Sequence, residues 1–372
     1  MFFAFIAASR PEILMDRPRS SGIDEKIKEA YSFICRNYNS DKNHEKGRGE
    51  TEIILIGFSR GAFNARCVAD LIDKIRILTK MGIHYLPDIY DAWQEDGKDF
   101  NKALLEAETL SLHPTAPSPA PIEVGKDRQT FMENLGSTLS NPKYVYRGVH
   151  VKVCAVWDTV ASLGYVSTHL RILKQWKSRK LAFVNSNLCS GIDHAIQALS
   201  LHEHRRPFCP IVWKLPDKDK DNQRNGKPRL QQCWFMDYHS DIGGGVRGEG
   251  LASFPLAWMI SKLSVFLTFD ASIFGTPRPG ELRWKFYNAN DPSSGPYVKL
   301  KDSMSKRYQL AGSYYRKPKR HFWLPSPKTC EPDKYKSSET VHFTVRLLEK
   351  NNFIGRPKMM EGITRDVEEA WR

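Results

Sequence analysis

The fold class of this chain is predicted chiefly by residues 53–62, Ile53-Ile54-Leu55-Ile56-Gly57-Phe58-Ser59-Arg60-Gly61-Ala62. The first four of these residues form a short apolar run of β-branched type, typical of a strand buried on both faces of a parallel sheet. Residues 57–61 have the pattern G-x-S-x-G, and apolar residues then recur at helical spacing from Ala62 to Ile75. A strand, this pattern and a helix in that order predict a nucleophile elbow, a tight turn that lifts a serine hydroxyl above the sheet edge.

The elbow predicts roles for two neighbouring residues. Ser59 is the expected nucleophile. The helix that begins there offers a positive N-terminus to a developing oxyanion, so the backbone N–H of Arg60 is the expected oxyanion donor. The structural alternative is a strand-to-helix turn with an incidental serine.

A serine hydroxyl needs a base to take its proton and a carboxylate to orient that base. In this type of fold, the acid and then the histidine follow the serine in the chain, at the carboxyl ends of later strands. Asp158 directly follows the apolar run 151–157, and His239 follows a third run, 233–238. We therefore predict Ser59, Asp158 and His239 as the catalytic set.

Other residues remain open for these roles. Asp241 lies two positions after His239 and is the alternative acid, while His342 also follows in chain order and is the alternative base. The structural alternatives are that Asp158 caps a helix and that His239 is a turn residue.

Hydrophobic periodicity predicts further elements before and after this turn. Strands that alternate with helices predict a parallel sheet with helices on both faces. The expected helices cover about 23–38, 192–201 and 255–263, a short strand lies near 211–213, and loops cover 39–50, 112–121 and 217–229.

Several ordered blocks of this chain resemble one family. They are GFSRGAFNARCVADLI (57–72), VWDTVASLG (156–164), HEHRRPF (202–208), WFMDYHSDIGGG (234–245) and LASFPLAWMI (251–260), with IDEKIKEAYSFICRNY (23–38) and TVHFTVR (340–346) at the two ends. They resemble the α/β-hydrolase domain of type VI secretion phospholipase effectors, long catalogued as a domain of unknown function and also present in fungal proteins. The resemblance implies an α/β-hydrolase-like fold and a Ser-Asp-His hydrolase of carboxylic esters or phospholipids. Ser59 matches the family's nucleophile, and we match Asp158 and His239 to its acid and base.

The same resemblance sets the expected domain plan. Residues 1–22 form an atypical lead-in, 23–346 the hydrolase-like domain with insertions near 80–145 and 214–230, and 347–372 a C-terminal tail. Family members usually begin with a strand that carries an Asp-Gly-Thr motif, which is absent here. We therefore expect the first strands to be missing, together with the loop that gives a second oxyanion donor. The alternative function is a catalytically impaired hydrolase-fold protein that acts as a binding or structural module.

Composition excludes some classes of protein. With 41% hydrophobic residues, the 372-residue chain is not disordered throughout, and no run approaches the ~18 apolar residues of a membrane-spanning helix. Seven scattered cysteines without a C-x-x-C pair argue against a disulfide framework and a zinc ribbon. We expect a cytoplasmic protein. The net charge of +14 favours anionic partners, among which peripheral contact with an anionic membrane suits a lipid hydrolase and nucleic acid is disfavoured.

Four weaker signals lie outside the catalytic set, and we expect no metal and no cofactor. Residues 243–248 contain G-x-G-x-x-G, but helix signals resume only near 255, so a loop is favoured over a dinucleotide site. His194, His202 and His204 lack metal-ligand spacing. The Arg205-Arg206 pair fits a phosphate head group or a helix end equally well. The basic and aromatic run 314–323 is expected to be a solvated loop, with attraction to a membrane surface as the second interpretation.

Overall fold

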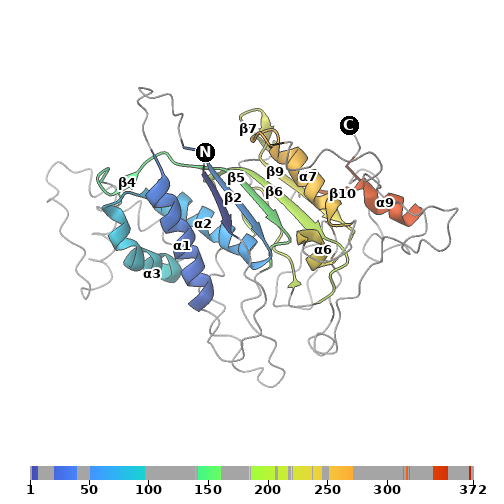
Figure 1. Cartoon of the computed structure of the whole chain (residues 1–372), viewed down its shortest axis with the longest axis horizontal. Coiled ribbons are helices and arrows are strands. Elements are labelled where there is room, and N and C mark those ends of the chain that lie inside the picture. The colour runs from blue at the N-terminus through green and yellow to red at the C-terminus, as the bar shows by residue number, and fades with distance from the viewer. Residues whose placement is uncertain are drawn as a thin grey trace, which may run out of the picture.

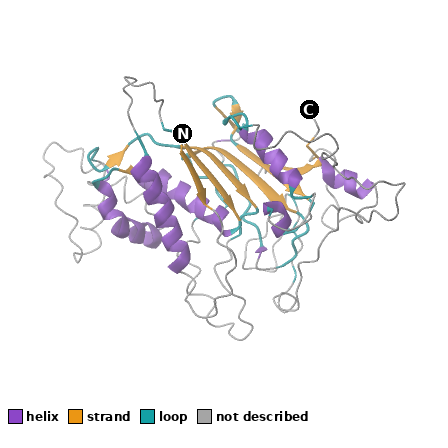
Figure 2. Ribbon diagram, in the orientation of Figure 1, coloured by secondary structure: helices purple, strands orange, loops and turns teal. Residues whose placement is uncertain are grey.

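The structure of the protein is a computed structural model of the 372-residue chain. It describes residues 2–6, 21–39, 51–96, 139, 141–160, 184, 186–205, 208–216, 219, 221–236, 238–244, 251–270, 313, 316, 318, 338–350 and 368–369. Figures 1 and 2 show a central sheet of strands that lie side by side, with helices packed against it.

The sheet is parallel throughout and its strand order is β1-β2-β5-β6-β9-β10-β11. Its strands are β1 (Phe2–Ile6), β2 (Ile53–Phe58), β5 (Val151–Trp157), β6 (Ile192–Ser200), β9 (Leu230–Phe235), β10 (Glu339–His342) and β11 (Glu368–Glu369). Two short antiparallel pairs lie outside it: β3 (Ile77–Leu78) with β4 (Val145–Tyr146), and β7 (Gln223–Arg224) with β8 (Lys227–Pro228).

Helices cover both faces of the sheet, as expected. They are α1 (Ser21–Asn37), α2 (Arg60–Ile75), the 3₁₀ helix η1 (Gly82–Tyr85), α3 (Leu86–Asp96), α6 (His239–Gly243), α7 (Ser253–Leu263) and α9 (Phe343–Lys350). Successive side chains of β2 alternate between the faces: Leu55 belongs to the core with α1 and α2, whereas Ile54 packs with α7. The sheet is therefore the middle layer of an α/β sandwich.

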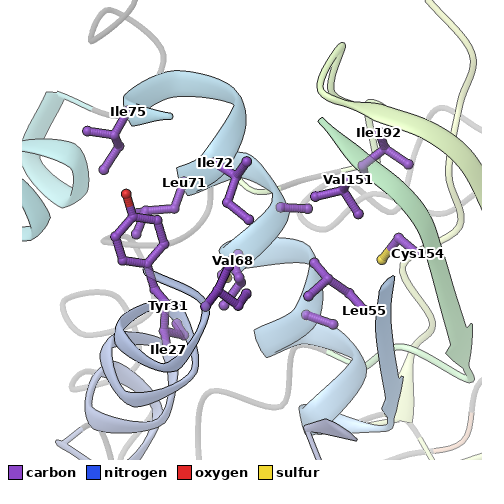
Figure 3. Close-up of a cluster of buried hydrophobic side chains, with 14 of the residues drawn as sticks. Ile27, Tyr31, Leu55, Val68, Leu71, Ile72, Ile75, Val151, Cys154 and Ile192 are labelled. Atoms are coloured by element: carbon purple, nitrogen blue, oxygen red, sulfur yellow. The ribbon is translucent and has the colours of Figure 1, made fainter. Parts of the chain in front are cut away.

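The larger core lies between the sheet and helices α1 and α2 (Figure 3). In α1, Ile27 and Tyr31 face Val68 and Leu71 of α2, and all four are fully buried. The Tyr31 hydroxyl donates a hydrogen bond to the carbonyl of Arg76 at 2.7 Å, so its polar atom is satisfied within the apolar layer. This core fixes α2, and hence the turn that precedes it, on the sheet.

The expected helix at 192–201 is wrong, because Ile192–Ser200 forms strand β6. Ile192, Ala195, Ile196 and Leu199 fit a helical spacing. However, β6 is paired on both sides, with β5 and β9, and covered on both faces, so it shows no alternation between apolar and polar residues. Helical periodicity and burial on two faces give the same pattern here.

The segment near 211–213 is also not a strand, although it lies against β9. The backbone N–H of Trp213 donates to the side-chain oxygen of Gln232 at 2.8 Å, and the Gln232 amide donates back to the Trp213 carbonyl at 3.0 Å. One buried side chain therefore makes the pair of hydrogen bonds that a neighbouring strand would make. The third predicted strand begins and ends three residues early, at Leu230 and Phe235, so that His239 opens helix α6 instead of ending a strand.

Phe2–Ile6 forms strand β1, in a segment where we expected an atypical lead-in and no strand. It pairs in parallel with β2, from Phe2 opposite Ile53 to Ile6 opposite Gly57. The five residues are apolar and rich in phenylalanine, a composition that favours strands. The strand that carries the G-x-S-x-G turn therefore has a neighbour on each side.

Two further expectations concern cysteines and membranes. None of the six cysteines among the described residues forms a disulfide. In the described part of the chain, no helix combines the length and apolar character that crossing a membrane requires.

Candidate active site

The turn between β2 and α2 has the geometry of a nucleophile elbow. Ser59 adopts a positive φ of 59° with ψ −121°, a conformation that costs a non-glycine residue about 1–3 kcal/mol. A Cβ atom on Gly57 would lie 2.5 Å from the carbonyl oxygen of Gly61 and 2.7 Å from the nitrogen of Ala62. The turn is therefore too tight for any side chain at position 57, which explains the glycine in the motif.

Ser59, His239 and Asp158 form one chain of hydrogen bonds. His239 Nε2 lies 2.7 Å from Ser59 Oγ, and His239 Nδ1 lies 2.6 Å from Asp158 Oδ2. All three residues are buried. A carboxylate only accepts hydrogen bonds, so Nδ1 carries the proton and Nε2 is left to accept from the serine hydroxyl.

The three side chains come from separate elements that meet at the carboxyl edge of the sheet. Ser59 follows β2, Asp158 follows β5 with a positive φ of 41°, and His239 is the first residue of α6 after β9. The carboxyl ends of parallel strands share one edge, so residues far apart in the sequence converge there.

Two aromatic rings pack against the His239 imidazole. The ring centroid of Phe58 lies 4.8 Å away and that of Phe208 lies 4.9 Å away. Gly243 supports Phe58, because a Cβ at this position would lie 2.4 Å from the Phe58 ring. The backbone N–H of His239 also donates to Glu203 Oε2 at 3.4 Å. The imidazole therefore has little freedom to turn away from Ser59.

Four hydrogen bonds converge on the Asp158 carboxylate, which has no exposed surface. The Ser200 N–H donates to Oδ1 at 3.1 Å, and Arg316 donates to Oδ1 at 2.6 Å and to Oδ2 at 3.1 Å, beside the bond from His239. Burial alone would raise the pKa of Asp158. The Arg316 charge and the His239 hydrogen bond outweigh it and lower the pKa to about 2.

Arg316 is the site residue that the sequence did not reveal. It lies in the run 314–323, which we expected to be a solvated loop, yet it is only 1% exposed. Its guanidinium also donates to the carbonyls of Ser200 and Phe208. Nothing in the local pattern distinguishes this arginine from the other basic residues of the run, because its partners lie more than a hundred positions away.

The alternative acid and base are not the residues that form the hydrogen-bond chain to Ser59. Asp241 is buried in the short helix α6, but the carboxylate that contacts the His239 ring is that of Asp158. His342 ends β10, where its Nδ1 lies 2.7 Å from Thr344 Oγ1 and its ring stacks on Phe235 at 4.6 Å. The hydrogen bond to Ser59 Oγ comes from His239.

The predicted oxyanion donor lies in the first turn of α2. Arg60 is the first residue of this helix, where backbone N–H groups have no acceptor within the helix. Its role remains a prediction. The expectation about a second donor concerns the chain before α1, of which residues 7–20 lie outside the described residues.

The weaker signals have structural explanations where the structure describes them. No three His, Cys, Asp or Glu side chains among the described residues are arranged to hold a metal. The helix at the glycine run begins before the run, at His239, and ends at Gly243, whereas a dinucleotide site needs a helix that begins inside the motif. Arg205 forms a two-point ion pair with Glu203, at 2.7 and 2.9 Å, while Arg206 lies outside the described residues.

Comparisons with known proteins identify a family that matches most of this chain. The model of the family described as "T6SS, Phospholipase effector Tle1-like, catalytic domain" matches residues 7–262. Among solved structures, a Tle1 effector bound to the VgrG spike of the type 6 secretion system is 19% identical, with a TM-score of 0.30. The match covers 62% of this chain and 32% of that one.

An uncharacterized protein from Pseudomonas aeruginosa is 16% identical, with a TM-score of 0.29, over 66% of this chain and 27% of that one. This chain therefore spans about a third of the length of the solved structures that it matches. No argument rests on these two likenesses, and no curated protein matches the chain.

Proposed function

Because this chain belongs to the family of T6SS phospholipase effector Tle1-like catalytic domains, we propose that it hydrolyses carboxylic esters of phospholipids through an acyl-enzyme on Ser59. The observation that carries this proposal is the unbroken hydrogen-bond chain from Ser59 through His239 to Asp158. The family match supports the lipid substrate, and the hydrogen-bond chain supports the chemistry.

In the first half of the reaction, His239 Nε2 takes the hydroxyl proton of Ser59 as Oγ attacks the acyl carbonyl. Charge collects on the carbonyl oxygen, where the Arg60 N–H donates to it. Asp158 holds the imidazole in the required tautomer and stabilises its protonated form. When the tetrahedral intermediate collapses, His239 returns the proton to the leaving alcohol, and the acyl group stays on Ser59.

In the second half, water replaces the alcohol. His239 removes a proton from the water, hydroxide attacks the acyl carbonyl, and the proton returns to Ser59 Oγ as the fatty acid leaves. Every proton that is taken up is therefore returned, and the enzyme ends unchanged.

Release of fatty acid from phospholipid vesicles tests the proposal. We expect the wild-type chain to release it and Ser59→Ala to lose the activity, because the nucleophile is removed while the fold is retained. Ser190→Ala is the matched control: Ser190 is exposed and hydrogen-bonds to Asp73, before the amino end of β6. Equal release by wild type and Ser59→Ala would contradict the proposal. A folded wild-type chain without any activity would favour the binding or structural module.

A further inference from the structure

One buried cation lies against the acid of the site. Arg316 is 1% exposed and Asp158 has no exposed surface, so neither charge is solvated by bulk water. The Arg316 guanidinium reaches both carboxylate oxygens, with Nη1 at 2.6 Å from Oδ1 and Nη2 at 3.1 Å from Oδ2. Such a two-point contact requires the planar fork of an arginine.

This contact restricts the Asp158 carboxylate to one orientation. Oδ1 accepts from Arg316 and the Ser200 N–H, and Oδ2 accepts from Arg316 and His239. Rotation of the carboxylate would break bonds at both oxygens. The guanidinium is itself fixed by the carbonyls of Ser200 and Phe208. The orientation of His239 therefore depends on a residue that touches neither His239 nor Ser59 in these contacts.

The same contact balances the charge of the site. A buried carboxylate without a cation takes up a proton readily, because burial penalises its charged form. With Arg316 present, the group of Asp158, neutral His239 and Arg316 has no net charge, and it carries one positive charge after His239 accepts the serine proton. Two further acids lie near His239: Glu203 is paired with Arg205, and Asp241 is buried in α6.

We propose that Arg316 is a positioning residue of the reaction, which holds the Asp158 carboxylate in the plane that orients His239 and keeps it from taking up a proton. The kinetic part of this inference rests on the proposed function. Arg316 lies outside the matched residues 7–262, so the C-terminal part of the chain completes the site. Ser313 supports this placement, because it forms a β-bridge with Arg205 beside the site.

Two substitutions separate the effect of the Arg316 charge from that of its two-point contact with Asp158. Arg316→Met removes the charge and the contact, and we expect kcat/KM to fall by ~10²-fold, the cost of misplacing a catalytic group by about 1 Å. We also expect the acid limb of its pH profile to move up by about 1–3 pH units, because Asp158, whose pKa Arg316 lowers, takes up a proton more readily without that cation. Arg316→Lys keeps the charge, so it should lower kcat while its acid limb stays closer to that of wild type.

The matched control is Arg229→Met. Arg229 is also 1% exposed, forms an ion pair with Asp219 and donates to the Cys189 carbonyl at 2.9 Å, but it lies at the amino end of β9, the edge of the sheet opposite Ser59. The Arg229→Met variant measures how the loss of a buried guanidinium changes the free energy of unfolding. The control should lose stability in urea without any shift of the acid limb.

An NMR measurement makes the result independent of hydrolysis. The proton on His239 Nδ1, shared with Asp158, should give a low-field resonance that persists to lower pH in wild type than in Arg316→Met. An unshifted acid limb and an unchanged resonance in folded Arg316→Met would overturn the role of Arg316 and leave the proposed function standing. A wild-type chain that hydrolyses nothing would contradict the proposed function, and the resonance would then decide the role of Arg316 by itself.

Discussion

The hydroxyl of Ser59 is presented to His239 by a backbone conformation that non-glycine residues rarely adopt. Its positive φ is held by α2 behind it and by the hydrogen bond from its own N–H to the Trp157 carbonyl, 2.9 Å away on β5. The neighbouring strand thus supports the turn at its most strained point. At Gly57 the approach of Gly61 leaves no room for a Cβ. The motif is therefore a packing requirement as much as a catalytic one.

At the residue scale, Asp158→Asn should lower kcat by about 10⁴-fold, because an amide at this position favours the wrong tautomer of His239. Asp241→Asn is the matched variant, with the same substitution on the other buried acid near His239, and it should retain most of the activity. Steady-state hydrolysis of a soluble ester by the two variants checks this. Greater loss in Asp241→Asn than in Asp158→Asn would show that the wrong carboxylate has been assigned to His239.

Elements that are specified by local sequence were predictable. The strand that ends at Phe58 and the helix that begins at Arg60 appear where the apolar run, the glycines and the helical spacing place them. Strand β6 was not predictable in this way, because burial on two faces removes the alternation by which a strand is distinguished from a helix. Sequence alone therefore predicted the strand, turn and helix around Ser59, but misassigned β6, which lies beside β5 in the sheet.

The site shows the same division. Ser59, Asp158 and His239 could be proposed because each follows an apolar run, and such positions meet at one edge of a parallel sheet. Arg316 could not, because its contacts with Asp158, Ser200 and Phe208 form only when distant parts of the chain fold together. No spacing between residues that are close in the sequence can predict such a long-range contact.

At the element scale, the packing of α2 against α1 and the sheet determines stability. Leu71→Ala should lower the free energy of unfolding by about 2–5 kcal/mol, because Leu71 is fully buried in the larger core. Leu256→Ala, the same change on an exposed position of α7, should alter it by less than about 0.5 kcal/mol. Urea unfolding of both variants measures the difference. Equal stabilities would contradict the placement of α2 in the core.

In the molecule as a whole, residues from distant parts of the chain meet at the carboxyl edge of the sheet. They are Ser59, Asp158, His239 and Arg316. Family membership is shown over residues 7–262, while the residue that pairs with the acid comes from position 316. The fold is α/β-hydrolase-like, with helices on both faces and one parallel sheet.

The net charge of +14 leads to a prediction about the substrate surface. A basic protein is attracted to anionic lipid, and salt screens this attraction, with a Debye length of ≈10 Å at 0.1 M. Hydrolysis of vesicles that contain phosphatidylglycerol should therefore slow as salt is raised, whereas hydrolysis of neutral phosphatidylcholine vesicles should change little. Fatty-acid release from both vesicle types over a salt series measures this. Equal salt dependence would rule out electrostatic attraction to the membrane surface.

The proposed reaction requires that Ser59 is an activated nucleophile. Labelling of the purified chain by a fluorophosphonate probe, with the adduct located by mass spectrometry, shows whether it is. We expect one phosphonylated residue, Ser59, and no labelling of Ser59→Ala at the same position or any other. A folded wild-type chain that does not react, or an adduct on a different serine, would contradict it.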